Sequence, residues 1–468
     1  MSQQSQQQYR YPGIRSFERD EQELFFGRGE EIRDLYSQVK VMNLVVLFAK
    51  SGIGKSSLLN AGLVPLLELE PFVPIKARFQ NVSMSPLESI KSALKPYLNE
   101  TILKRHTGNE PEKTGLWEYL RACTFTRYGE TATPVFLLDQ FEEFFEHSEE
   151  AQKSIVLDIA DIISQRLPNR VRDHLLNIPI ADRTPEDMVW HQPLPAKFIL
   201  AIRSDRLSLL DNLSTEIPLI LHNRFHLRPL QRDKAQDAII EPAALPGGGF
   251  STPPFSYADK TLLLILNELT NKNQEIESFQ LQLICQYIER QVQRHAAGAV
   301  VNKFVIDRTF IPDAESIQSI LNDYYESAID NLPAGEQELA RDFIETGLIV
   351  ANRRVGVTEG VEQERYKIGP ELLKALIESR LIRVENTHLG RSYEISHDTL
   401  VPAILKSYEI RRKLKEQKAA EAERLIPDCS RVRLTGAGHL IHWLQTESLL
   451  RLVLSFLESL ETCGDLSR

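Results

Sequence analysis

The stretch "LVVLFAKSGIGKSSLLNAG", residues 44–62, decides the fold of this chain. Its apolar start belongs to a run rich in β-branched residues, 43–48, which predicts a strand buried on both faces. The apolar residues of 56–67 recur at helical spacing, so a helix is expected there. Between strand and helix lies the pattern G-x-x-x-x-G-K-[ST] of a phosphate-binding loop (P-loop), with Ala49 in place of the first glycine.

The loop has the groups needed to bind the phosphates of ATP or ADP. Its backbone N–H groups would hold phosphate, Lys55 would neutralise the outer phosphates, and the Ser56 hydroxyl would bind Mg²⁺. Ala49 is compatible because the first position mainly turns the chain out of the strand and tolerates a negative φ. A ligand-free turn rich in glycine and serine is the alternative. The expected nucleotide-binding residues here are Ser51, Gly52, Ile53, Gly54, Lys55, Ser56 and Ser57.

A second polar element follows an apolar run in "VFLLDQFEEFFEH", residues 135–147. Asp139 would stand at the carboxyl end of a buried strand, where ligands bind in open α/β sheets, and would complete the Mg²⁺ site. Glu142 or Glu143 would polarise the attacking water, and the sequence does not choose between them. The alternative is a strand followed by an acidic, solvated turn.

Further strands are expected at 72–79, 134–139, 197–203 and 224–227, separated by helical segments. This alternation predicts a parallel, doubly wound sheet. Arg203 ends the strand "KFILAIR" and is placed either to contact the γ-phosphate or to pair with a carboxylate near Asp139. A surface arginine at a strand end is the alternative.

Composition excludes several classes of protein. The net charge of −10 over 468 residues argues against a general nucleic-acid coat. The four cysteines form no CxxC pair, which indicates neither a metal site nor a disulfide framework. No apolar run approaches the ~20 residues that span a bilayer, and the N-terminus lacks the apolar core of a secretory signal. A cytoplasmic location without membrane contact is therefore expected.

The pattern changes along the chain and suggests several regions. "PAALPGGGFSTPPF" (242–255) is expected to be a hinge, and residues 168–196 an insertion. The order helix, strand, turn, strand in 371–398 is typical of a winged helix. The expected regions are a disordered lead (1–10), an α/β P-loop NTPase core (11–245), a helical domain (246–335), a winged-helix domain (336–405), a charged connector helix (406–425) and a C-terminal segment (426–468).

Taken in order, several motifs resemble the STAND class of signal-transducing P-loop NTPases, and specifically the bacterial novel STAND group. They extend over residues 9 to 415. The P-loop occurs in many families, whereas "FFGRGEEI", "LLDQFEE" and "EISHDTL" in this order are more specific. The motifs are "YPGIRSF", "FFGRGEEI", "SGIGKSSLLNAG", "FLLDQFEE", "LAIRSD", "RFHLRPL" and "YEISHDTL".

The resemblance implies a slowly hydrolysing ATPase switch that closes over ADP and opens on exchange for ATP. A protein trigger or effector and a regulated homo-oligomer are the partners that it implies. It assigns Arg28 to an element beside the nucleotide, Glu143 to the catalytic acid and Arg203 to a phosphate sensor. It also assigns Pro229 to packing near adenine, and His397 to contact with ADP phosphates. From the residues alone, His397 is more simply a histidine beside a helix cap at Asp398.

Three features depart from the family pattern. Ala49 replaces the first loop glycine, and Leu227 stands where the family often has glycine. The chain also shows neither the effector domain nor the repeat-type sensor that such proteins usually carry. Residues 426–460 are similar to the last strand and helix of an α/β-hydrolase, with His439 in "GAGH", but no G-x-S-x-G nucleophile motif occurs. We expect either a non-catalytic appendage or a chance amphipathic strand and helix.

Other functions remain as alternatives. The main one is a scaffold that holds nucleotide without useful turnover. Ester hydrolysis by the C-terminal segment is opposed by the missing nucleophile motif. DNA binding by the winged helix is opposed by the acidic balance and by the family's use of that domain as a nucleotide lid.

Overall fold

The computed structural model divides the chain into two compact units, Met1–Tyr408 and Glu409–Arg468. The elements described below lie in the first unit, except that helix α17 (Leu400–Leu425) continues into the second. The expectations for 426–468, including His439, fall outside the described residues, as does Asp398. The described residues are 8–80, 84–107, 114–177, 179, 184, 189–190, 192, 194–247, 249–270, 273–296, 304–310, 316–387, 390–397 and 400–425.

A five-stranded parallel sheet forms the centre of the first unit, in the order β2-β5-β6-β1-β7. The prediction of a parallel sheet is confirmed, and all five strands form where the sequence predicts them. The ranges are β1 (Leu44–Ala49), β2 (Phe72–Ala77), β5 (Thr133–Leu138), β6 (Lys197–Arg203) and β7 (Arg224–His226).

Both faces of the sheet are buried, because successive side chains of a strand point to opposite faces. Phe136 and Phe198 face one side and stack with ring centroids 4.9 Å apart. Their neighbours Val135 and Ile199 belong to a separate core on the other face. The strands therefore carry continuous apolar runs rather than an alternation of apolar and polar residues.

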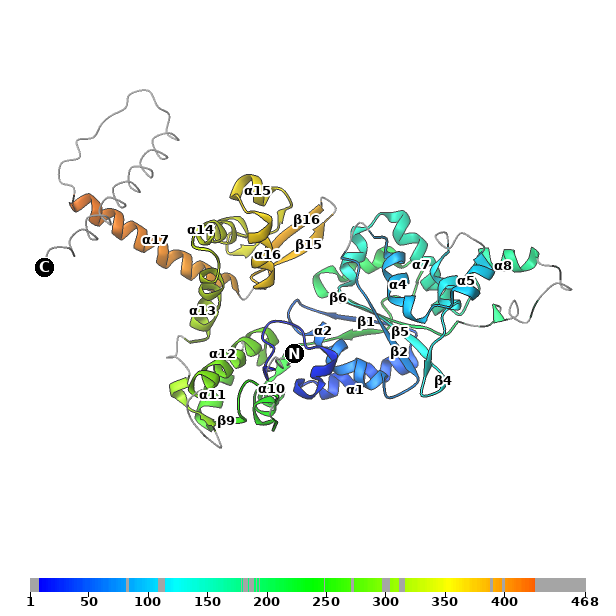
Figure 1. Ribbon diagram of the computed structural model, residues 1–468, viewed down its shortest axis with the longest axis horizontal. Coiled ribbons are helices and arrows are strands. Elements are labelled where there is room, and N and C mark those ends of the chain that lie inside the picture. Colours follow the sequence, from blue (N-terminus) through cyan, green and yellow to red (C-terminus); the bar gives the residue numbers. More distant parts are fainter. Residues whose placement is uncertain are drawn as a thin grey trace, which may run out of the picture. The chain divides into compact units, whose positions relative to one another are not determined.

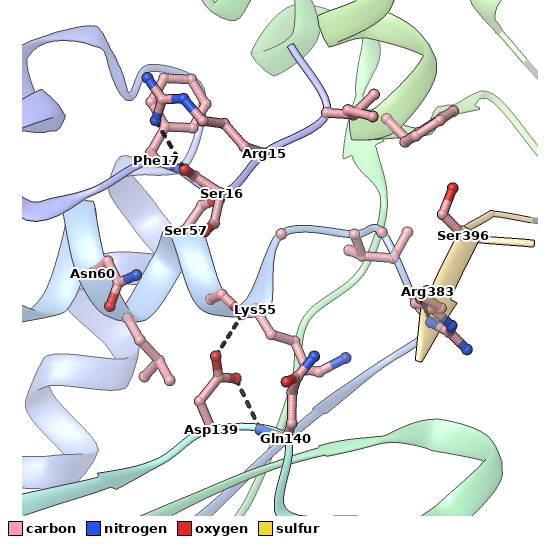
Figure 2. Close-up of a pocket in the computed structure, with 18 of the residues that line it drawn as sticks. Arg15, Ser16, Phe17, Lys55, Ser57, Asn60, Asp139, Gln140, Arg383 and Ser396 are labelled. Carbon is pink, nitrogen blue, oxygen red and sulfur yellow. Dashed lines mark hydrogen bonds between the residues drawn. The ribbon is translucent and has the colours of Figure 1, made fainter. Parts of the chain in front are cut away.

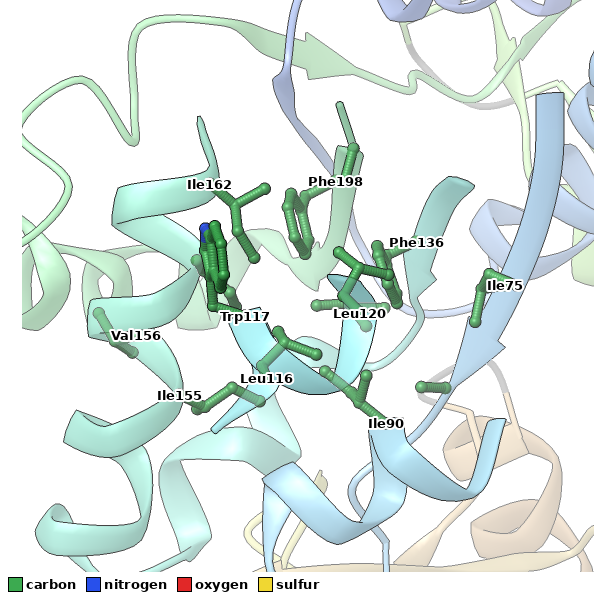
Figure 3. Packing of buried hydrophobic residues seen from close by; sticks show 14 of the residues in the cluster. Ile75, Ile90, Leu116, Trp117, Leu120, Phe136, Ile155, Val156, Ile162 and Phe198 are labelled. Carbon is green, nitrogen blue, oxygen red and sulfur yellow. The ribbon is translucent and has the colours of Figure 1, made fainter. Parts of the chain in front are cut away.

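Helices cover the two faces (Figure 1). Helix α1 (Gly29–Val41) and the helix after the P-loop pack on the face that carries Val135. Helices α4 (Pro86–Leu94), α6 (Leu116–Arg121) and α7 (Glu149–Ile163) pack on the face that carries Phe136, as Figure 3 shows. Helices α5 (Glu100–Thr107) and α8 (Asn169–Asn177) also form, the latter within the segment expected to be an insertion.

The helix after the P-loop forms in three consecutive parts. These are α2 (Lys55–Ser57), a π-helical turn (Leu58–Leu63) and α3 (Val64–Leu67). Pro65 lacks the N–H that an α-helix would direct to the fourth preceding carbonyl, which is consistent with a widened turn before it.

A helical region, here residues 230–306, has its own core. It contains α10 (Arg232–Ala244), α11 (Asp259–Leu269) and α12 (Ser278–Ala296), with two short paired strands, β9 (Phe255–Tyr257) and β11 (Phe304–Ile306). Helix α10 packs against α11 and α12, and within this region the core that they share begins at Leu230. The boundary predicted at 245 stays a prediction, and α10 lies before it while sharing this core.

The C-terminal region, here residues 316–408, surrounds another core. Its helices are α13 (Ser316–Asp330), α14 (Ala334–Asp342), α15 (Val361–Tyr366) and α16 (Pro370–Glu378). Its antiparallel sheet has the order β14 (Val357–Thr358), β16 (Gly390–Ile395), β15 (Ile382–Thr387). Helix α13 contributes Tyr325 and Ile329 to this core, although the sequence placed it in the preceding domain.

An N-terminal segment, residues 8–18, is held by the helical region. The backbone N–H groups of Arg10 and Tyr11 donate to the Glu289 carboxylate at 2.8 and 3.1 Å. The Arg10 guanidinium donates to the carbonyl of Pro242 at 2.9 Å. Arg10 is fully buried, so the ordered structure includes a residue that was assigned to the disordered lead.

Truncating Phe136 should destabilise the first unit strongly. Phe136→Ala removes a ring that is fully buried and stacked on Phe198, and is expected to lower the free energy of unfolding by about 3–5 kcal/mol. Urea denaturation followed by tryptophan fluorescence would measure this, since Trp117 and Trp190 lie in the same core. The control Val41→Ala, at a residue 74% exposed, should change stability by less than about 0.5 kcal/mol. Equal effects of the two substitutions would contradict the described packing.

Candidate functional site

A cavity of about 1190 Å³ lies at the carboxyl ends of β1, β5 and β6. The P-loop and the residues after β5 form its floor, and Figure 2 shows Lys55 and Asp139 there. Residues 13–18 of the N-terminal segment form one wall, and Arg383 of the C-terminal region lies in another. Segments far apart in sequence thus enclose a single space.

Two positions of the P-loop have a backbone conformation that favours glycine. Gly52 and Gly54 have φ values of +78° and +105°, which residues with a β-carbon rarely adopt. Ala49 is the last residue of β1 and pairs with Arg203 of β6, so it remains in extended backbone. The replacement of the first loop glycine is therefore accommodated by the strand.

Ser56 and Asp139 come together as predicted, and Arg78 joins them. The Ser56 hydroxyl donates to Oδ2 of Asp139 at 2.7 Å, and the Arg78 guanidinium donates to the same oxygen at 2.7 Å. A hydroxyl and a carboxylate are the oxygen ligands that Mg²⁺ prefers, supplemented by phosphate and water, so this pair fits the ion. Sequence reasoning missed Arg78, although it follows directly after β2 at the same edge of the sheet.

Lys55 and Glu142 are partly buried charges that support each other. Burial lowers the pKa of Lys55, while the carboxylates of Glu142 and Asp139 oppose that shift. Burial raises the pKa of Glu142, against the opposing charges of Lys55 and Arg203. Glu142 also accepts a hydrogen bond from the backbone N–H of Arg203 at 3.3 Å. Glu143 lines the same cavity.

The guanidinium of Arg203 lies between two carboxylates. It donates to Asp205 through Nε at 3.1 Å and through a terminal nitrogen at 2.9 Å. Its other terminal nitrogen lies 3.7 Å from the carboxylate of Glu394, which belongs to β16 of the C-terminal region. Pairing with a carboxylate is one of the two roles expected for Arg203, and the carboxylates of Asp205 and Glu394 both lie beside its guanidinium.

The family model for Novel STAND NTPase 1 matches residues 11–417 of this chain. The chain belongs to this family. It is therefore a nucleotide-binding P-loop NTPase, and the cavity above its P-loop is the candidate site. A comparison with curated proteins found no match.

Among solved structures, the fold is similar to a Walker-type ATPase of Pyrococcus abyssi at 12% identity and a TM-score of 0.38. That match covers 83% of this chain and 97% of the other. The Aeropyrum pernix ORC2 protein, in complexes with ADPNP and ADP, matches at 13% identity and a TM-score of 0.39, covering 86% of this chain and 96% of its own.

Arg28 of this STAND NTPase contacts the backbone of the P-loop. It is 3% exposed and donates to the carbonyl of Ile53 at 3.2 Å and to that of Arg228 at 2.8 Å. Burial lowers its pKa, and the ion pair with Glu31 opposes this shift. Ser278 of α12 also donates to the Ile53 carbonyl, at 3.1 Å, a contact that the sequence did not indicate.

His397 lies against the P-loop. Its Nε2 is 3.2 Å from the carbonyl oxygen of Ser51, and its ring stacks on Phe279 with centroids 4.3 Å apart. A β-carbon on Gly52 would lie 2.2 Å from Nε2, so His397 reinforces the need for glycine at that position. The structure thus places His397 at the loop and packs it on Phe279, while its contact with ADP phosphates stays a prediction.

Of the expected site residues, Pro229 does not line the main cavity, whereas Ser57 does. Pro229 lines a separate hollow of about 510 Å³, while the next residue, Leu230, lines the main cavity. The hydroxyl of Ser57 faces the N-terminal segment and accepts a hydrogen bond from the N–H of Phe17 at 3.1 Å (Figure 2). Sequence reasoning did not indicate that 13–17 would line the site.

Across the described part of the chain, no helix is both long enough and apolar enough to cross a membrane. The same residues contain no group of three or more His, Cys, Asp or Glu side chains suited to hold a metal ion. A metal at Ser56 and Asp139 would thus depend on phosphate and water for its remaining ligands.

Replacing Glu142 should change how stability depends on pH. Because burial raises the folded-state pKa of Glu142 above its ordinary 4.5, the native chain loses stability as pH rises through that pKa. Glu142→Gln removes this loss, so the melting temperature of the variant minus that of wild type should increase as the pH rises above 4.5. Thermal melts across this range would measure the difference. Glu130→Gln, at an exposed position, should show a constant difference, and a constant difference for Glu142→Gln would refute the assignment.

Proposed function

We propose that this protein is a STAND-type switch that binds ATP and ADP, hydrolyses ATP slowly and changes its assembly with the nucleotide. One observation carries the proposal, namely that the C-terminal region contacts the P-loop itself. Arg383 donates to the Ser51 hydroxyl at 2.8 Å, and His397 lies 3.2 Å from the carbonyl oxygen of Ser51. A ligand bound to this loop would therefore influence how the C-terminal region is held.

The residues divide into binding and catalytic groups. Loop N–H groups from Ser51 to Ser57 would bind phosphate, and Lys55 would neutralise it. Ser56 and Asp139 would hold Mg²⁺, whose positive charge would offset that of the phosphates. Glu142 or Glu143 would accept the proton of the attacking water, and both line the cavity. Arg203 would stabilise charge on the terminal phosphate.

The three regions serve distinct roles in this proposal. The α/β core binds the nucleotide, and the helical region supports the loop through Ser278. The C-terminal region, which we propose is a winged-helix domain, acts as a lid through Arg383 and His397. Arg28 links the loop to Arg228, two residues before the helical region begins. We further propose a cytoplasmic location, a protein trigger and regulated homo-oligomerisation.

A scaffold that holds nucleotide without useful turnover is the second candidate. The contacts that Arg203 makes with Asp205 and Glu394 favour it, because they engage the group that would assist hydrolysis. The two candidates share nucleotide binding and differ in whether Glu142 or Glu143 performs chemistry.

Freshly purified protein should release nucleotide when it is denatured. We expect about one ADP per chain, identified by chromatography, and none from Lys55→Ala, which removes the buried cation of the loop. Lys153→Ala, at an exposed lysine of α7 that does not line the cavity, is the matched control and should retain nucleotide. Wild-type protein without nucleotide, and without measurable affinity for added ATP or ADP, would refute the proposed function.

Hydrolysis should depend on the acidic residues after β5. Glu142→Gln, Glu143→Gln and the double variant should separate the candidates in a single-turnover assay of phosphate release. If one carboxylate is the general base, its loss should slow hydrolysis at least about a hundredfold while binding persists. Glu130→Gln should match wild type. A double variant as active as wild type would exclude this catalytic role and leave the scaffold.

A further inference from the structure

Glu394 of β16 is surrounded by three arginines from different parts of the chain. Arg354 and Arg383 belong to the same C-terminal region. Their Nε atoms lie 3.8 Å and 2.7 Å, respectively, from carboxylate oxygens of Glu394. The third partner, Arg203, comes from the end of β6, at 3.7 Å. The side chain of Glu394 is 15% exposed, so little solvent screens these charges.

Arg203, which also donates two hydrogen bonds to Asp205 of its own region, is placed where it can reach either the nucleotide or Glu394. Strand β6 lies between β1 and β5, so its carboxyl end faces the cavity between the P-loop and Asp139. The Arg203 side chain is 10% exposed and its backbone is fixed by the hydrogen bond to Glu142. A guanidinium binds carboxylate and phosphate with similar geometry, so the two anions are direct competitors for it.

We propose that Glu394 is the residue through which the switch distinguishes ATP from ADP. In this inference, which rests on the proposed function, Glu394 holds Arg203 when the bound nucleotide ends at the β-phosphate. The terminal phosphate of a nucleoside triphosphate takes Arg203 from Glu394. A triphosphate in the cavity thereby breaks the ion pair between the α/β core and the C-terminal region, and a diphosphate leaves it intact.

The surroundings of Glu394 make this exchange feasible. A buried carboxylate left without a partner would oppose the release of Arg203 strongly. Glu394 retains Arg383 and Arg354 on the same region, so its charge stays compensated after Arg203 departs. The ion pair between Arg203 and Glu394, which joins the two regions, is lost.

The same strand pair connects Glu394 to the P-loop. Arg383 on β15 pairs across the sheet with Glu394 on β16, and it donates to the Ser51 hydroxyl. His397, three residues after Glu394, contacts the carbonyl of Ser51. Loss of the pair with Arg203 would remove one of the contacts that hold these two side chains on the loop.

The test compares affinities for ADP and for a non-hydrolysable ATP analogue in the full chain. Glu394→Gln keeps the shape of the side chain and removes its charge, so the triphosphate no longer has to displace it. The affinity ratio should shift toward the triphosphate about tenfold, which corresponds to about 1.4 kcal/mol, with ADP affinity nearly unchanged. Glu371→Gln, the same change at an exposed position of α16, should leave the ratio as in wild type.

A double-variant cycle separates this role from a structural one. In an Arg203→Gln background, Glu394→Gln should no longer shift the ratio, because Glu394 acts through Arg203. If Glu394→Gln fails to fold, Glu394→Asp should give a smaller shift in the same direction. Wild type that binds both nucleotides, with a ratio unaffected by either substitution, would overturn this inference alone. Wild type that binds neither would overturn the proposed function instead.

Discussion

The placement of β6 between β1 and β5 determines how the site is assembled. Backbone pairing sets Ala49 beside Arg203 on one side and Leu138 beside Leu200 on the other. Two strand spacings separate the P-loop from Asp139, roughly 10 Å, which the side chains of Ser56 and Asp139 can bridge. The chain leaving β6 emerges in the middle of this gap. Arg203, the last residue of β6, therefore lines the cavity between the two motifs, where a change in charge acts on its guanidinium.

The charges beneath the cavity are tolerated because they are mutually compensated. Desolvation acts against the charged forms of both Lys55 and Glu142, yet each is supported by the other's opposite charge. Arg28 shows the same balance between burial and Glu31. Placing these charges away from water costs stability locally. The apolar residues packed on both faces of the sheet offset this cost. The site residues thus lie at the ends of the strands, and the residues that stabilise the fold lie along the strands themselves.

Local patterns predicted the sheet well, and predicted contacts between distant segments only in part. Continuous apolar runs identify doubly buried strands, and a polar residue after each run identifies the edge where Ser56 and Asp139 meet. Glycine and proline mark turns rather than the limits of a core, so they do not indicate that α10 packs with α11 and α12. No local sequence pattern predicts that Phe17 contacts Ser57 or that Glu394 pairs with Arg203. Those contacts arise from tertiary packing, which residue spacing does not encode.

The N-terminal segment has a mechanical consequence for any opening of the site. Arg10 and Tyr11 are fastened to Glu289 of the helical region, and the N–H of Phe17 is fastened to Ser57 above the P-loop. The chain between residues 11 and 17 can extend to about 20 Å at most. The helical region and the P-loop helix can therefore separate only within the reach of this short tether. A wider opening must first withdraw the buried guanidinium of Arg10 or release Phe17, and either event would expose a previously protected stretch of backbone.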